Sequence, residues 1–303
     1  MSGTSKIPFS KPWLSYPDQV QLLQRRGLTV PDPQAAEQFL SHLNYYRFSG
    51  YCLAFENGRH NFNGGTTFDD VVAAYYFDLT LRDLLTEALE VVEVDLRAAI
   101  AYEFGQRYGA FGHTRPSNFY GQFNHTNWLD GLRQEAGRSS ELFVRHFQQT
   151  YVEFPDLPVW IVTEVMSFGT LSHMYKGMLR EVQRVVAQRY GIQASFLKSW
   201  MHHCVYVRNV CAHHSRLWDR VWAIRPQLLP IANWQPPMLP SDQHLFATLL
   251  VLHKLLSHIQ QAQAFTAQWK QRGEQHIARP PAAPNPFRRM GLTNNWMAHP
   301  VWT

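Results

Sequence analysis

The chain has 303 residues, 45% hydrophobic and 14% aromatic, which is enough apolar material for a sizeable core in one or two compact units. A disordered chain is therefore excluded. The three cysteines are too few for a disulfide framework, and no apolar signal peptide follows Met1, so we expect a soluble protein of the reducing cytoplasm. The longest apolar run, Leu245 to Leu256, is far shorter than the roughly 20 residues of a membrane span.

The formal net charge is +5, and residues 254–303, with six lysines and arginines against one glutamate, account for all of it. The rest of the chain is neutral overall. This balance permits a nucleic acid or an acidic partner without requiring either, because net charge governs encounter and solubility rather than the fold.

Helical spacing of apolar residues dominates the sequence, and no alternating run is long enough for a central sheet, so we expect a mostly α fold. Residues 1–66 are predicted to form a small N-terminal α/β-hairpin unit. Its short helices are expected at 17–27 and 31–44, and the Gly64-Gly65 pair indicates a hairpin or irregular loop between Arg47 and Phe68.

Residues 67–272 are predicted to form a helical bundle. Thr67 and Asp70 resemble a capping box and open the longest periodic segment, which we expect to end at Gly105. Further helices are expected at 128–151, 159–178, 180–190, 195–214 and 242–272. Residues 273–303, rich in proline and arginine, are predicted to be a flexible basic tail.

The segment 195–214 carries the residues with the clearest chemical potential. On a helical wheel its apolar residues form one broad stripe centred on Leu197, and Arg208 falls about 20° from that centre. A buried arginine without a partner costs several kcal/mol. We therefore expect Arg208 either to pair with Glu90 or Glu93 as a structural contact, or to bind a phosphate of a ligand. The guanidinium suits a phosphate because it can donate two parallel hydrogen bonds.

The opposite face of the same helix carries polar residues. Asn209 and His213 are four residues apart and therefore neighbours, and an amide can fix the tautomer of an imidazole that exchanges protons near neutral pH. On a straight helix, Arg208 and His213 lie about 140° apart around the axis and about 7.5 Å apart along it. Either the helix distorts after Cys211, or two copies of the chain share their pockets; we favour the second.

These residues match a known pattern. The run Arg208-Asn209-Val210-Cys211-Ala212-His213 resembles the R-N-x-x-x-H signature of HEPN ribonucleases, and its continuation to Arg220 resembles the Abi branch, the abortive-infection proteins of phage resistance. Three further blocks are similar to the same family and occur in the same order, at residues 44–51, 77–82 and 158–172. The resemblance covers about residues 10–260.

The resemblance implies a HEPN-type helical bundle that dimerises through its motif helices and cuts RNA with no metal ion or other cofactor. It implies that the ribose 2′-hydroxyl attacks, activated by His213 or its twin, while Arg208 holds the scissile phosphate and Asn209 orients the ring or the phosphate. Products would carry a 2′,3′-cyclic phosphate and a 5′-hydroxyl, and DNA would resist.

The resemblance also bears on regulation. Some HEPN toxins carry a tyrosine two positions after the histidine, where a paired antitoxin modifies it, and here Ser215 occupies that place. Regulation by adenylylation at this position is therefore not expected. A non-coding RNA or a protein antitoxin is a candidate restraining partner.

Other basic residues are candidate RNA contacts, but a purely structural role would also explain each of them. Arg47 lies among aromatic residues that either stack on bases or pack the N-terminal unit. Three residues beyond His213 are candidates for further phosphate contacts: His214, Arg216 and Arg220. Alternatively, the two arginines are only solvent-exposed side chains at the end of a helix.

Two further patterns are assigned structural roles. The histidines and cysteines between His202 and His214 point to different sides of one helix, so we expect no metal site. Glu93 and Arg97, four apart, are expected to form a surface ion pair.

Three functions follow from the sequence. The first is a metal-independent endoribonuclease that acts as a phage-triggered toxin. The second is a catalytically silent HEPN module that binds RNA and regulates a partner. The third is a helical adaptor that binds only protein.

Overall fold

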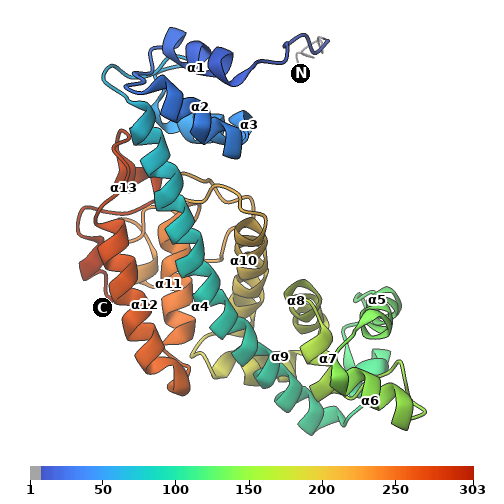
Figure 1. The fold of residues 1–303 in the computed structure, drawn as a ribbon. Helices are drawn as coiled ribbons and strands as arrows, with labels where there is room; N and C mark the ends of the chain where they lie inside the picture. The colour runs from blue at the N-terminus through green and yellow to red at the C-terminus, as the bar shows by residue number, and fades with distance from the viewer. Residues whose placement is uncertain (1–7) are drawn as a thin grey trace. The chain divides into compact units, whose positions relative to one another are not determined.

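A computed structural model describes residues 8–303, and these are helical through most of their length (Figure 1). The described residues contain isolated β-bridges but no β-strand, which confirms the mostly α prediction. The chain divides into two compact units. The first contains the residues up to Asp78 together with Pro280–Pro286, and the second contains Leu79–Arg279 together with Phe287–Thr303.

The first unit begins with two short helices close to their predicted positions, α1 (Tyr16–Arg25) and α2 (Pro33–His42). Both start at a side-chain cap. The Ser15 hydroxyl accepts a hydrogen bond from the Asp18 backbone N–H, and the Asp32 carboxylate accepts one from the Ala35 N–H at 3.0 Å. Such caps satisfy backbone donors that the first helical turn leaves without partners.

The segment between Arg47 and Phe68, expected to be a hairpin or an irregular loop, is irregular only in its second part. Its first residues instead form α3 (Tyr45–Cys52), followed by a short 3₁₀ turn and a single antiparallel bridge between Glu56 and Phe62. The helix was not expected, but Phe48 and Tyr51 are buried at helical spacing on α3. The Phe48 ring stacks on Phe68 with centroids 4.8 Å apart.

The long helix α4 (Phe68–Tyr108) begins at the predicted capping box, since Thr67 N–H donates to Asp70 Oδ2 (2.8 Å) and Asp70 N–H donates to Thr67 Oγ1 (3.1 Å). It continues past Gly105. A Cβ at Gly105 would meet Val159 Cγ1 at 3.1 Å, so this glycine permits close helix packing rather than ending the helix. The helix ends instead before Gly109, whose φ of 76° is left-handed.

The other helices of the chain, in order, are α5 (His125–Arg138), α6 (Leu142–Thr150), α7 (Val159–Val165), α8 (Phe168–Gly177), α9 (Arg180–Gln188), α10 (Ala194–Ala212), α11 (Leu245–Leu256), α12 (Gln263–Ile277) and α13 (Pro286–Arg289). Three segments predicted as single helices, 128–151, 159–178 and 242–272, are therefore each divided into two.

The break between α7 and α8 has a clear cause. Ser167 caps α8 by accepting a hydrogen bond from the Thr170 N–H (3.1 Å), while Glu135 of α5 accepts from the Ser167 N–H (3.3 Å) and the Thr170 hydroxyl (2.8 Å). Helix α8, which this break separates from α7, packs against α10, where a Cβ at Gly169 would lie 3.8 Å from Val205 Cγ1. This packing sets the direction of α10.

In Figure 1, helices α11 and α12 run alongside the part of α4 that belongs to the second unit. Two contacts join α12 to α4 directly. The Trp269 indole N–H donates to the Leu84 carbonyl (2.9 Å), and Arg272 forms a two-pronged ion pair with Glu87. Within residues 8–303, no helix combines the length and the apolar character needed to cross a membrane.

The predicted flexible tail is wrong for its last residues, which pack into the second unit. Trp302 is fully buried, its indole N–H donates to Glu274 Oε1 (2.9 Å), and its ring contacts Trp269 and Trp296. The prediction of a flexible tail rested on the many prolines and arginines of this segment. A rule based on overall composition does not identify the few residues, here Trp296 and Trp302, that become buried.

Candidate functional site

The candidate site lies at the C-terminal end of α10, the longest helix after α4. The buried residues of α10 are Phe196, Leu197, Trp200, Met201, His203, Cys204, Val207, Val210 and Cys211. Their arc on the helical wheel is centred about 50° from Leu197, on the side away from Arg208. Arg208 therefore lies at the edge of the buried stripe, and it is half-buried rather than enclosed as predicted.

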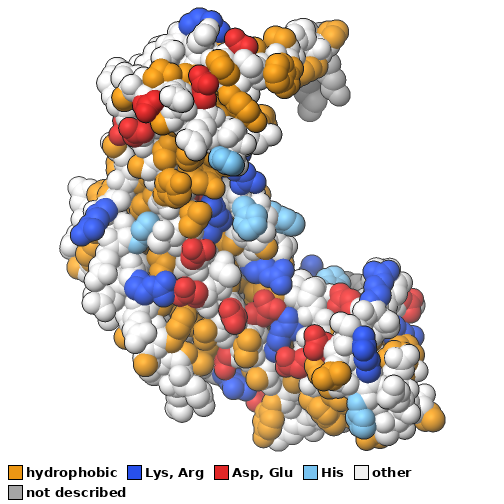
Figure 2. All heavy atoms as spheres, viewed as in Figure 1, with side chains coloured by type: hydrophobic (Ala, Val, Ile, Leu, Met, Phe, Trp, Pro, Cys, Tyr) orange, Lys and Arg blue, Asp and Glu red, His pale blue; other side chains and the backbone are white. Residues whose placement is uncertain are grey.

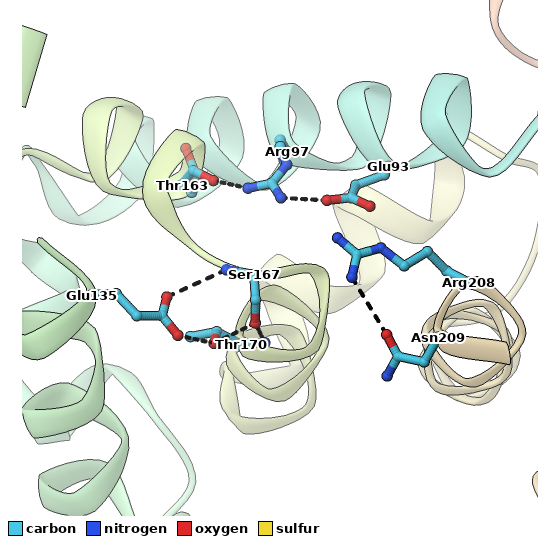
Figure 3. Close-up of polar contacts among 8 residues, drawn as sticks. All are labelled: Glu93, Arg97, Glu135, Thr163, Ser167, Thr170, Arg208 and Asn209. Carbon is cyan, nitrogen blue, oxygen red and sulfur yellow. Dashed lines mark hydrogen bonds and ion pairs between the residues drawn. The ribbon is translucent and has the colours of Figure 1, made fainter. Parts of the chain in front are cut away.

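The guanidinium of Arg208 donates a long hydrogen bond to the side-chain oxygen of its neighbour Asn209 (3.4 Å). Figure 3 shows Arg208 extending from α10 toward α4, on the side of Glu93. The predicted structural pair of Arg208 with Glu90 or Glu93 is not formed in the described part of the chain. Glu93 pairs instead with Arg97, which also donates to the Thr163 carbonyl.

The Glu93–Arg97 pair itself forms as predicted, but it is not a surface pair. The two side chains are only 13% and 11% exposed. A buried pair holds its members in place because each would be costly to leave uncompensated. Among residues 8–303, Arg208 forms no ion pair with a carboxylate, so its guanidinium keeps donors available on a half-exposed surface.

The end of α10 is a Schellman turn. The Ser215 N–H donates to the Val210 carbonyl (3.0 Å), and the His214 N–H donates to the Cys211 carbonyl (2.9 Å). His214 adopts the left-handed conformation with φ of 52°, which costs roughly 1 kcal/mol for a residue with a Cβ. The chain therefore turns sharply one residue after His213.

The helix stays regular up to this turn. The His213 N–H still donates to the Asn209 carbonyl (3.0 Å), and the φ and ψ of His213 are −87° and 11°. The separation of Arg208 and His213 by about 140° around the axis therefore holds. Asn209 and His213 are both exposed, so an amide and an imidazole face solvent one helical turn apart.

Arg82 of α4 supports the turn that follows His213. This arginine is only 6% exposed, and its guanidinium donates to the Ser215 carbonyl at 3.5 Å. Leu217 and Trp218, just beyond the turn, are fully buried and anchor the chain there. Arg82 is thus a positioning residue that the sequence reasoning did not assign, although the block 77–82 contained it.

A family model described as Abi-like protein matches residues 38–219, which is more than half of the chain. The chain belongs to the Abi-like protein family. The match includes Arg208, Asn209 and His213, and membership points to abortive-infection defence against phage. No curated protein and no solved structure gave a significant match to the chain.

The other predicted RNA contacts of this Abi-like protein are only partly available. Arg216 lies 3.9 Å from Asp219, which also pairs with Arg289 at 3.0 Å. Arg220 is half-buried, and its Nη1 atom is buried without a hydrogen-bond partner. Arg47 lies exposed on α3 in the first unit.

The histidines and cysteines of α10 do not gather in this Abi-like protein. Across residues 8–303, no group of three or more His, Cys, Asp or Glu side chains is placed to hold a metal ion. Cys204 is buried in the apolar stripe, where burial raises the pKa of its thiol to about 12. His203 is a core residue bonded to the Ile224 carbonyl and the Thr248 hydroxyl.

Proposed function

We propose that this Abi-like protein is a metal-independent endoribonuclease of the HEPN type. The observation that carries the proposal is the end of α10, where a half-buried guanidinium, an amide bonded to it and an exposed imidazole occur within six consecutive residues. Arg208 suits a phosphate, and the imidazole of His213 can accept and donate a proton. Family membership supports the same assignment.

In the proposed reaction, the His213 imidazole takes the proton from a ribose 2′-hydroxyl, and the 2′ oxygen attacks the adjacent phosphorus. The bond from phosphorus to the 5′ oxygen breaks, and that oxygen takes up a proton. Arg208 stabilises the charge that develops on the phosphoryl oxygens, and Asn209 orients the imidazole or the phosphate. The products are a 2′,3′-cyclic phosphate and a 5′-hydroxyl.

The active form we propose is a homodimer through the motif helices. The regular course of α10 keeps Arg208 and His213 of one chain on different sides of the helix. Two copies that face each other would bring His213 of one copy beside Arg208 of the other. The two chains then share two composite pockets.

In the cell, the proposed enzyme acts as a toxin that degrades RNA after phage infection. Such an activity needs restraint in uninfected cells, and we propose a non-coding RNA or a protein antitoxin for that role. Asn209 and His213 are exposed and Arg208 is half-buried, so a bound partner could cover them.

The test is to incubate purified protein with mixed RNA in excess EDTA and to identify the product ends by mass spectrometry. We expect cyclic-phosphate ends, and a rate lower by roughly 10²- to 10⁴-fold in His213→Ala. His146→Ala is the matched control, because His146 is an exposed histidine on α6.

Two outcomes would overturn the proposal. RNA binding that weakens with salt, without cleavage by the wild type, would assign a silent RNA-binding module. Neither binding nor cleavage would leave the protein-binding adaptor.

A further inference from the structure

A basic hollow of about 890 Å³ lies between α8, α9 and the start of α10. Four of its lining side chains are cationic, Lys176, Arg180, Arg184 and Lys198, and none of its lining residues is acidic. All four are exposed, and none forms an ion pair within the described part of the chain. Their charges therefore add within one concave surface.

The acidic residue nearest in sequence does not neutralise this hollow. Glu181 pairs with Arg107 and lines a separate, smaller hollow. On the face drawn in Figure 2, by contrast, basic and acidic side chains are interspersed. Because four cations and no carboxylate line this hollow, it favours a ligand with several negative charges.

One wall of the hollow is aromatic and held in place. The Tyr120 N–H donates to the Gly177 carbonyl (2.9 Å), which ties the wall to the end of α8. Phe123 covers Gly177 so closely that a Cβ there would lie 2.5 Å from the ring, and the Phe123 ring lies 5.0 Å from that of His173. Phe123 is also stacked on Phe119, with centroids 5.0 Å apart, so it supports the wall. The exposed ring of Tyr120 offers a stacking surface for an unpaired base.

The hollow continues toward the candidate site. A second hollow of about 450 Å³, between α8 and α10, shares His173, Lys176 and Lys198 with the first and extends along α10 to His202 and Val205. We call the two hollows together the basic groove.

The face of α10 that lines the basic groove is the face that carries the imidazole. Lys198, His202, Val205, Asn209 and His213 recur at intervals of three or four residues and fall within an arc of about 80° on the helical wheel. The distance along the helix from Lys198 to His213 is about 22 Å. An extended ligand that binds along the groove and continues on the same face of α10 would therefore reach Asn209 and His213.

We propose that the basic groove binds a single-stranded RNA whose scissile linkage lies at Asn209 and His213. This proposal rests on the proposed function, and it adds the path of the substrate. Lys176, Arg180, Arg184 and Lys198 contact phosphates away from the cut, and the exposed ring of Tyr120 stacks on a base. The aromatic wall favours RNA over an acidic peptide, which has no bases to stack.

The first experiment measures binding in the His213→Ala background, so that cleavage does not interfere. The probe is a fluorescent 20-nucleotide single-stranded RNA of mixed sequence, titrated at several salt concentrations. The triple substitution Lys176→Gln, Arg180→Gln and Arg184→Gln should weaken binding about tenfold and lower the salt slope by about 2, at roughly 0.7 per lost phosphate contact.

The matched control replaces three exposed arginines outside the groove, Arg138→Gln, Arg145→Gln and Arg279→Gln. We expect its affinity to stay within about twofold of the parent. Equal losses in the two triple variants would overturn the proposal, since the effect would then follow net charge alone. Displacement of the RNA by poly-L-glutamate as readily as by unlabelled RNA would also overturn it, in favour of a general polyanion site.

The second experiment separates the groove from the chemistry. With His213 intact, the groove variant should cleave a dinucleotide as fast as the control variant but a 20-nucleotide RNA about tenfold more slowly. Loss of RNA binding in the groove variant, with no cleavage by any variant, would refute the nuclease and retain the groove. Cleavage of both substrates at control rates would refute the groove and retain the nuclease.

Discussion

Acid should destabilise this protein through His203, a fully buried histidine of α10. Its Nδ1 lies 2.7 Å from the Ile224 carbonyl, which can only accept, so Nδ1 carries the proton and donates. Nε2 then accepts from the Thr248 hydroxyl at 2.9 Å. The neutral ring therefore satisfies both contacts, and a second proton on Nε2 would oppose the hydrogen bond from Thr248.

Burial lowers the pKa of His203 to about 4, and the charge of His202 adds to this, against the opposing effect of the Ile224 carbonyl. In the unfolded chain the pKa is about 6.5. Between pH 6.5 and 4 the unfolded chain thus binds more protons, so the free energy of unfolding falls as the pH falls. The contribution lost by pH 4 is about 3 kcal/mol, at about 1.4 kcal/mol for each pH unit.

The perturbation is His203→Gln, which removes the titrating group, and the assay is urea unfolding of wild type and variant at pH 7, 5.5 and 4. We expect the wild type to lose about 3 kcal/mol more than the variant between pH 7 and 4. His113, whose pKa is also lowered by burial to about 4, is present in both proteins and cancels in the difference. Parallel pH profiles would refute the reasoning.

Three further predictions concern the dimer and the packing. Mixed dimers of Arg208→Ala and His213→Ala chains, purified with two tags, should recover part of the RNA cleavage that each homodimer lacks; no recovery would refute shared pockets. Trp302→Ala should lower the free energy of unfolding in urea by about 3–5 kcal/mol, because it removes a fully buried indole; a loss below 1 kcal/mol would show that the C-terminal residues pack weakly. Glu135→Ala should cost about 1–3 kcal/mol, since it removes two hydrogen bonds to the start of α8; an unchanged urea midpoint would refute that role.

Local rules predicted much of the helical structure. The capping box at Thr67 and Asp70 formed as expected, because both partners lie within four residues of each other. The break at Ser167 was not predictable in the same way. It depends on Glu135, which is 32 residues distant in sequence and reaches Ser167 only through the packing of α5.

The sequence by itself determined the helical class, the family and the order of the arginine, amide and imidazole on α10, since each depends on residue type and spacing along the chain. Only the tertiary structure decided that Arg208 lies half-exposed at the edge of the buried stripe, because burial depends on which helices pack against α10. It also revealed the basic groove, which the sequence did not indicate because the positive and negative charges outside residues 254–303 sum to zero. Charge counted along a chain does not record which side chains come to face the same space.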